Sequence, residues 1–223
     1  MITWRRLGPT GLVRGRHTGR VPRSYGGQGA DSRIAARRSA LLAAGRELMG
    51  TVGTDRTTMT AVCAAAGLTE RYFYESFSGK ADLVVAVVDA LADEVRDTAR
   101  RALETTEGSE IERVRAALTA VVTLLLDDPR KGRIAVVESI ASAELRVQRH
   151  RTLAGVVDFV SAAALTIWGP RAVVESQRQL AGMMLVGACT ELLLARLEGT
   201  RDLEIDDIVD AATALFVATT RRD

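Results

Sequence analysis

Apolar side chains recur every three or four positions along most of the chain after residue 30, which is the period of an amphipathic helix. Alternation of apolar and polar residues never runs long enough to indicate a half-buried strand. Alanine and leucine, the best helix formers, dominate this part of the chain, and only four prolines occur among the 223 residues. The pattern therefore predicts an all-α protein.

Glycines, prolines and capping residues divide this pattern into nine expected helices. The first carries its apolar stripe from Ile34 to Met49. Two short helices follow, one ending at Gly67, which suits a left-handed C-cap, and one running from Thr69 through Phe77. Six longer helices are expected to begin near residues 81, 109, 128, 143, 169 and 205.

The chain divides into a basic N-terminal part and an acidic remainder. Residues 1–82 carry 13 arginines and lysines against 6 acidic residues, and the rest carries 17 against 22. A basic part on an acidic remainder predicts contact with a polyanion, and a basic tail is the alternative explanation. We expect a flexible basic extension, a helix-turn-helix domain, a linking helix and a helical C-terminal domain over residues 1–30, 31–80, 81–100 and 101–223. The extension is either an arm that touches DNA or sequence upstream of the true start.

The segment from Thr57 to Lys80 pairs two short helices across a tight turn, which is the arrangement of a helix-turn-helix. Phe73 and Phe77 lie four positions apart and are expected on the inner face of the second helix. This leaves Arg71 on the outer face, where a guanidinium can donate two parallel hydrogen bonds to guanine. The first helix then braces the second, which enters the major groove of DNA.

The same segment resembles the signature of the TetR family of bacterial transcriptional repressors over about residues 33–95. The matching residues, in chain order, are Thr57-Thr58, Val62, Ala66-Gly67, Thr69, Phe73-Tyr74, Phe77 and Lys80. The resemblance implies a nine-helix architecture with a three-helix DNA-binding domain. It implies DNA contacts, to bases or phosphates, by Thr57, Thr58, Met59, Thr69, Glu70, Arg71, Tyr72, Tyr74 and Lys80. Met59 is apolar and Glu70 acidic, which departs from the hydrogen-bonding pattern of the family.

The resemblance also implies a repressor that a small-molecule effector releases from a palindromic operator. Its effector pocket would lie between the C-terminal helices. The candidate lining residues are Glu138, Phe159, Trp168, Met183, Met184, Cys189 and Glu191, with plain core packing as the alternative for each apolar one. The effector itself is unknown from the sequence. A constitutive DNA-binding protein without effector control is the alternative function.

A two-fold homodimer is expected through the last two long helices, about Ala172–Glu198 and Ile205–Thr220. The first of these is apolar nearly all round between Leu180 and Leu194, which is wider than one core stripe requires. Two such helices from each subunit form a four-helix bundle, a common symmetric interface. The alternative is that both helices only close the core of the monomer.

Other function classes find little support in the residue content. The two histidines, His17 and His150, are far apart, and no cluster of ionisable groups indicates an enzyme, a metal site or a bound cofactor. The two cysteines, Cys63 and Cys189, form no disulfide framework, which favours a reducing cytoplasm. The first 30 residues lack the apolar run of a signal peptide, and no transmembrane segment is expected.

Overall fold

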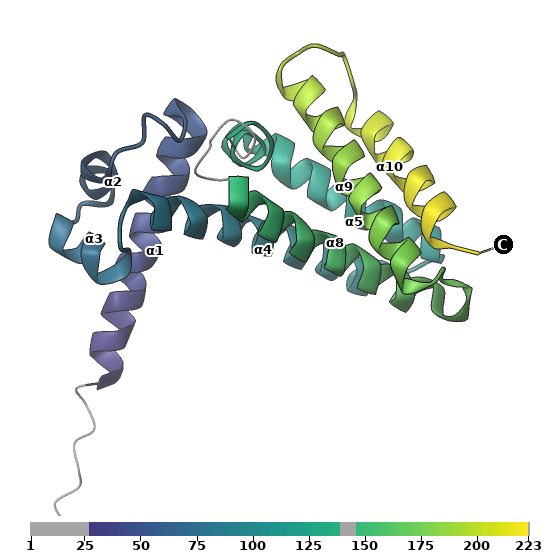
Figure 1. Cartoon of the computed structure of the whole chain (residues 1–223), viewed down its shortest axis with the longest axis horizontal. Coiled ribbons are helices and arrows are strands. Elements are labelled where there is room, and N and C mark those ends of the chain that lie inside the picture. The colour runs from purple at the N-terminus through teal and green to yellow at the C-terminus, as the bar shows by residue number, and fades with distance from the viewer. Residues whose placement is uncertain (1–26, 139–145, 223) are drawn as a thin grey trace, which may run out of the picture.

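The structure is a computed structural model that describes residues 27–138 and 146–222. Over these residues the chain forms nine α-helices and no strand, as the apolar pattern predicts (Figure 1). A π-helical segment, η1 (Arg133–Glu138), and a 3-10 turn, η2 (Gly169–Arg171), complete the fold. The helices are α1 (Gly27–Val52), α2 (Met59–Ala66), α3 (Glu70–Ser76), α4 (Lys80–Thr105), α5 (Glu110–Asp127), α6 (Pro129–Gly132), α8 (Arg146–Trp168), α9 (Glu175–Leu197) and α10 (Ile205–Thr220).

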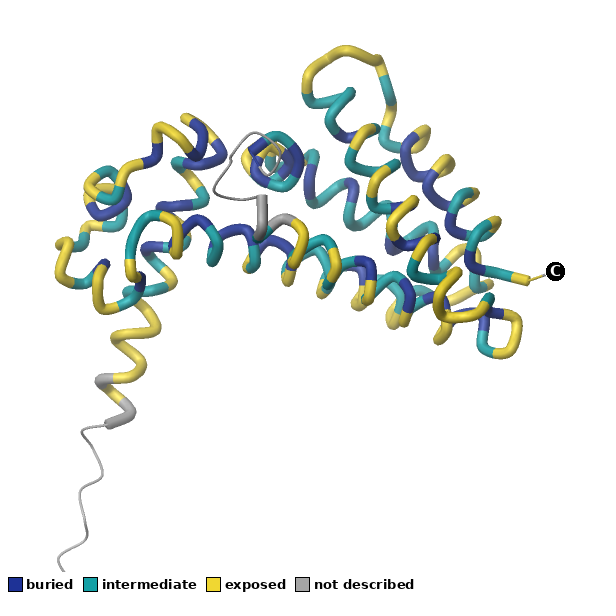
Figure 2. The backbone as a smooth tube through the Cα atoms, viewed as in Figure 1, coloured by how far each residue is buried: buried dark blue, intermediate teal, exposed yellow. Residues whose placement is uncertain are grey.

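Helices α1 to α3 form a small unit at one end of the molecule, and α4 runs from it into a C-terminal bundle (Figure 1). One buried cluster extends through both parts. It joins Phe73 and Phe77 of the small unit to Leu83 on α4, and continues to Ile134 and Val209. The blue band of buried residues along α4 in Figure 2 follows this cluster. The core therefore does not break at the boundary between the two parts.

A second buried cluster lies at the far end of the C-terminal bundle. Its centre is Trp168, whose ring lies 6.1 Å from that of Phe216 on α10. The indole Nε1–H of Trp168 donates to the hydroxyl of Thr220 at 2.8 Å, so the buried polar edge of the ring has a partner. This contact ties the end of α8 to the end of α10.

Helices α5 and α6, which are expected to begin near residues 109 and 128, carry capping residues in the structure, whereas Thr69 precedes α3 without a side-chain capping hydrogen bond. Ser109 and Glu112 form a reciprocal capping box at the start of α5. Asp128 accepts a hydrogen bond from the backbone of Arg130, and Pro129 occupies the first turn of α6. These local signals place both helix starts correctly.

Three expected boundaries are wrong. Helix α1 begins at Gly27, before the start expected at residue 31. The helix expected from residue 128 to about 141 is divided into α6 and η1 at Gly132, where a Cβ would lie 2.5 Å from the carbonyl oxygen of Leu125. Residues 139–145, including the expected end of this helix and the expected start of the next, lie outside the described residues.

The third wrong boundary is the start of α9, which is Glu175 and not the expected region of residues 169–172. Ala172 pairs with Arg221 in an isolated antiparallel bridge, and the N–H of Val173 donates to the carbonyl of Thr220 at 3.0 Å. These bonds to the end of α10 hold the residues after η2 in an extended conformation, so the helix begins later.

Two helical stretches, His150–Arg171 and Glu175–Leu197, are long and apolar enough to cross a membrane by length and composition alone. The core helices of soluble proteins pass the same test, and here α8 and α9 pack against each other. Only 28% and 22% of the two apolar windows is buried within one copy of the chain. The exposed large apolar side chains of these two helices are Leu165 on α8 and Leu180, Met183 and Met184 on α9.

Candidate DNA-binding surface and internal cavity

The turn between α2 and α3 has the geometry of a helix-turn-helix. Thr58 caps α2 by accepting a hydrogen bond from the backbone of Ala61 at 3.2 Å. Gly67 ends α2 with φ 64° and ψ 30°, the left-handed conformation that favours glycine. The N–H of Leu68 then donates to the carbonyl of Cys63 at 2.9 Å and closes the turn. The expected C-cap and turn are confirmed.

Helix α3 is held against the core by its phenylalanines. Phe73 and Phe77 are buried, with ring centroids 5.6 Å apart. The opposite face is open to solvent: the side chain of Arg71 is 84% exposed, and Tyr74 is 58% exposed. The inward and outward faces that the spacing predicts are therefore both present.

Two arginines of α1 brace α3, and sequence reasoning did not identify them. Arg37 donates to Glu75 at 3.2 Å and lies 4.4 Å from the centroid of the Tyr72 ring. Arg38 donates to the carbonyl of Ser76 at 2.5 Å and stacks over the ring of Phe77. These contacts join positions about 38 residues apart, for which the sequence carries no local signal. They fix the end of α3 relative to α1.

The residues expected to contact DNA lie on one side of this unit, with differing exposure. Thr58, Thr69, Glu70, Arg71 and Tyr74 are exposed, and Tyr72 and Lys80 are half-buried. The Lys80 ammonium donates to the carbonyl of Asp55 at 3.2 Å, at the start of α4. Most of the expected set is therefore exposed or half-buried on α2, α3, the first turn of α4 and the residues just before α2 and α3.

Two members of the expected set face inward. The side chain of Thr57 is fully buried, and its hydroxyl donates to the carbonyl of Gly53 at 2.8 Å. Met59 is half-buried and packs against the first core cluster. Thr57 therefore stabilises the loop before α2, and the side chains of both residues are used for packing in this structure.

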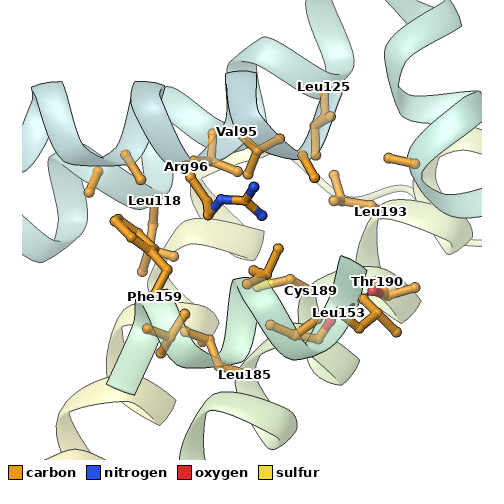
Figure 3. A pocket seen from close by; sticks show the side chains of 18 of the residues that line it. Val95, Arg96, Leu118, Leu125, Leu153, Phe159, Leu185, Cys189, Thr190 and Leu193 are labelled. Carbon is orange, nitrogen blue, oxygen red and sulfur yellow. Dashed lines mark hydrogen bonds between the residues drawn. The ribbon is translucent and has the colours of Figure 1, made fainter. Parts of the chain in front are cut away.

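The C-terminal bundle contains a cavity of about 220 Å³. It lies between α4, α5, α8 and α9, and Figure 3 shows the side chains that surround it. Its wall is almost entirely aliphatic, with Leu118, Leu125, Leu153, Leu185 and Leu193 among its lining residues. The cavity is thus an internal binding space of apolar character.

Of the residues expected in an effector pocket, Phe159 and Cys189 line this cavity. Met183, Met184 and Glu191 are exposed on the opposite face of α9. The indole of Trp168 is buried in the second cluster, and Glu138 lies at the junction with the DNA-binding unit; neither lines the cavity.

Much of the cavity wall comes from α4 and α5, which supply none of the residues expected in an effector pocket. Val95 and Arg96 on α4 and Leu118 on α5 line it, because these helices face α8 and α9 across the bundle. Among the described residues that line the cavity, the only charged side chain is Arg96. Burial raises the pKa of the Cys189 thiol to about 11, so this group is neutral at physiological pH.

Glu138, at the end of η1, connects the cavity wall with the DNA-binding unit. Its carboxylate accepts a hydrogen bond from the buried backbone N–H of Thr54 at 2.7 Å and from Arg133 at 3.1 Å. Burial raises the pKa of this carboxyl, but these hydrogen bonds outweigh it and hold the pKa below its usual value. Ile134 and Val136 of the same segment line the cavity. One short element therefore touches both the cavity and the loop before α2.

No group of three or more histidine, cysteine or acidic side chains that could hold a metal ion occurs in residues 27–138 and 146–222. Both cysteines are free thiols.

A braced helix with a polar outer face that carries Arg71 and Tyr74, joined to an all-helical domain with an internal cavity, is typical of a DNA-binding protein of the helix-turn-helix class. Residues 41–87, from α1 into α4, match the model of the family described as bacterial regulatory proteins, tetR family. Over this segment the chain is similar to the tetR family of transcription regulators, which supports a role in DNA-binding regulation. Among curated protein sequences, none matches the chain.

Solved structures of transcription regulators share this fold over more than four fifths of the chain. The fatty acid degradation regulator FadR from Bacillus halodurans has 15% identity and a TM-score of 0.69, over 83% of this chain and 97% of that one. FadR from Bacillus subtilis, solved in complex with stearoyl-CoA, has 14% identity and a TM-score of 0.67, over 81% and 98%. A TetR-like regulator from Rhodococcus sp. RHA1 has 18% identity and a TM-score of 0.58, over 82% and 94%. The expected nine-helix architecture is confirmed.

Proposed function

We propose that the protein is a repressor that binds a palindromic operator as a homodimer and leaves it when a small molecule enters the internal cavity. The observation that carries this proposal is the connection between the two sites: η1 lines the cavity and, through Glu138, holds the loop that precedes α2. A ligand that alters the position of η1 therefore acts directly on the support of the DNA-reading unit.

The reading of bases falls to Arg71. Its side chain is 84% exposed and makes only a long contact, 3.5 Å, between its Nε and Glu75 Oε1. A guanidinium so placed is free to donate two hydrogen bonds to guanine O6 and N7. Tyr74 and Lys80 lie on the same side and are suited to phosphate contacts, which hold the register and carry no sequence information.

Two routes connect the cavity to this face. The first is α4, which begins at Lys80 beside α3 and whose residues Val88, Leu91 and Val95 line the cavity. The second is η1 with Glu138. Because both routes are rigid packed elements, a change at the cavity shifts the two reading units of a dimer relative to each other. Effector coupling in such systems is commonly about 1–3 kcal/mol and is reciprocal.

Dimerisation is supported by the outer face of α9. Leu180, Met183 and Met184 are exposed and lie on one stripe with Gly187, opposite the stripe that lines the cavity. Contiguous apolar surface of this kind marks a protein interface. On α10, next to α9, small alanine side chains are exposed and allow a second copy to approach closely. A dimer also supplies two DNA-binding units, one for each half of a palindrome. We place this dimer in the cytoplasm.

Selection of binding sites from random duplex DNA tests the DNA-reading part. The wild-type protein is expected to select a palindrome. Arg71→Ala should weaken operator binding by about 1–3 kcal/mol and relax the preference at one base pair in each half-site. Lys80→Ala is the matched control, because loss of a phosphate contact weakens all DNA about equally and lowers the salt slope by about one. An unchanged selected motif for Arg71→Ala contradicts the base-reading role.

Sedimentation equilibrium tests the dimer. Met184→Arg, in the exposed stripe of α9, should give a folded monomer with lost operator binding. Ile111→Arg is the control, since Ile111 is an exposed apolar residue on α5, outside that stripe. A wild-type protein that is monomeric at micromolar concentration contradicts the proposal. A dimer whose operator affinity no small molecule changes supports the alternative, a constitutive DNA-binding protein.

A further inference from the structure

We infer that the cavity binds an amphipathic organic anion, with an apolar body of roughly nine carbon atoms and a single carboxylate held by Arg96. The inference rests on the proposed function, because it takes this cavity as the effector site and names the chemistry of the effector. Three features of the cavity support it: the polarity of the wall, the placement of one guanidinium, and the size of the space.

The wall offers almost no polar partner to a ligand. Thr152 and Thr190 are the two hydroxyl residues that line the cavity. Thr152 donates to the carboxylate of Asp89 at 3.1 Å, and Thr190 donates to the carbonyl of Val186 at 2.7 Å, so both hydroxyl protons are already engaged. Apart from the neutral Cys189 thiol, a weak donor, a ligand acceptor therefore meets hydrogen-bond donors only at Arg96 among the lining residues that the structure describes.

Arg96 reaches from α4 across the cavity toward α8. Figure 3 shows its guanidinium directed into the space between the surrounding aliphatic side chains. A Cβ added at Gly155 on α8 would lie 3.4 Å from the Nη1 atom of Arg96, which shows how closely the guanidinium approaches that helix. The side chain is 23% exposed, so Arg96 lies where the cavity meets solvent.

Some N–H donors of the Arg96 guanidinium are not engaged in hydrogen bonds within the described residues. Its Nη2 atom pairs with Asp93, whose side chain is 68% exposed. Its Nε and Nη1 atoms have no hydrogen-bond partner in the described part of the chain. Planar guanidinium donors match the two oxygens of a carboxylate, and a charge-assisted pair at the edge of an apolar space is stronger than a neutral hydrogen bond. A cationic ligand would be repelled at the same position.

The volume sets the length of the apolar part. An apolar cavity of about 150 Å³ holds benzene, with its six carbons. By the same ratio the 220 Å³ present here encloses roughly nine carbon atoms. Decanoate, with nine carbons beyond its carboxylate, fits this description. A coenzyme A thioester carries several negative charges, and the described lining offers a single arginine to pair with them.

Isothermal titration calorimetry on the full-length protein tests the inference with decanoate and with 1-decanol, its neutral counterpart. Wild-type protein is expected to bind decanoate at least ten-fold more tightly than decanol. Arg96→Met, which keeps the apolar stem, should weaken decanoate binding at least ten-fold and leave decanol binding within two-fold, so retained decanol binding also reports an intact cavity. Arg96→Lys, which keeps the charge but not the planar donors, should have a smaller effect.

Arg100→Met is the matched control. Arg100 lies one turn further along α4 and pairs with Asp97 as Arg96 pairs with Asp93, but it does not line the cavity. Its removal should leave decanoate binding within two-fold. The inference is overturned if wild-type protein does not bind decanoate, if decanol binds as tightly, or if Arg96→Met and Arg100→Met weaken decanoate equally.

Operator release, measured separately by fluorescence anisotropy, distinguishes this inference from the proposed function. If decanoate binds through Arg96 but leaves operator affinity unchanged, the ligand class stands and the effector role fails. If decanol or stearoyl-CoA releases the operator and decanoate does not, the effector role stands and the carboxylate inference fails.

Discussion

Replacing Glu138 tests whether η1 holds the DNA-binding unit in place. Glu138→Ala removes the carboxylate that accepts a hydrogen bond from the backbone N–H of Thr54. Thr54 is buried, with 1% of its surface exposed. The net value of a hydrogen bond to a charged group is about 1.5–3 kcal/mol, and Glu138→Ala loses it. The contact with Arg133 adds less, because that side chain is 44% exposed. We expect Glu138→Ala to lower the free energy of unfolding by about 2–3 kcal/mol.

Two further variants separate the hydrogen bond from the charge. Glu138→Gln keeps an oxygen that can accept from Thr54 and loses only the charge, so we expect a cost of about 1 kcal/mol. Glu47→Gln is the control for any ion pair across the same junction, since Glu47 pairs with Arg130 between α1 and α6 at the surface. Its cost should stay below about 1 kcal/mol.

Urea denaturation followed by circular dichroism, at one fixed protein concentration because a dimer is expected, gives the free energies. The same variants are then measured for operator affinity with and without an effector. The reasoning is refuted if Glu138→Ala unfolds within about 0.5 kcal/mol of wild type, or if Glu47→Gln costs as much. A destabilised Glu138→Ala protein with undiminished effector response would refute the relay through η1 while leaving its structural role intact.

Three other predictions concern stability. Gly50→Ala should destabilise the protein by about 1–3 kcal/mol, because a Cβ there would lie 2.8 Å from the Cα of Arg130. The control Gly45→Ala should cost less, because its Cβ would meet only the ends of side chains. Urea denaturation compares the two variants. Phe73→Ala should cost about 3–5 kcal/mol in the same assay, since Phe73 is fully buried. Because the folded state lowers the pKa of Glu138, the stability that this carboxylate contributes is present above the ordinary glutamate pKa of about 4.3 and is lost as the pH falls through the folded value. Melting temperatures of wild type and Glu138→Gln should therefore converge in acid, and a constant difference would contradict this.

The DNA-binding unit could be predicted from sequence because its signals are local. The cap at Thr58, the left-handed turn at Gly67 and the i, i+4 pair of phenylalanines each depend on neighbours within one or two turns. What such signals could not supply was the distinction between Thr57 and Thr58. Their side chains differ in burial because the hydroxyl of Thr57 turns back to the carbonyl of Gly53.

The cavity could be predicted only as a possibility. Helix α9 is apolar on nearly every side, so its period does not say which face lies inward; the structure turns Leu185 and Cys189 to the cavity and Met183 and Met184 to solvent. The bond between Glu138 and Thr54 joins residues 84 positions apart. Such pairings follow from how whole helices pack, and no local pattern in one sequence encodes them.

The continuous core has a consequence for experiments that exchange the DNA-binding unit of this regulator. Chimeras are usually cut between units that fold alone, and a cut after residue 80 would separate Phe73 and Phe77 from Leu83, on which they depend for burial. The transplanted DNA-binding unit would then pack against an α4 from another protein, with cavities or steric overlaps between side chains that cost several kcal/mol. A transplant that keeps its own α4 and a matching η1 carries the buried contacts between these elements with it. This exchange should yield a folded regulator with new DNA specificity.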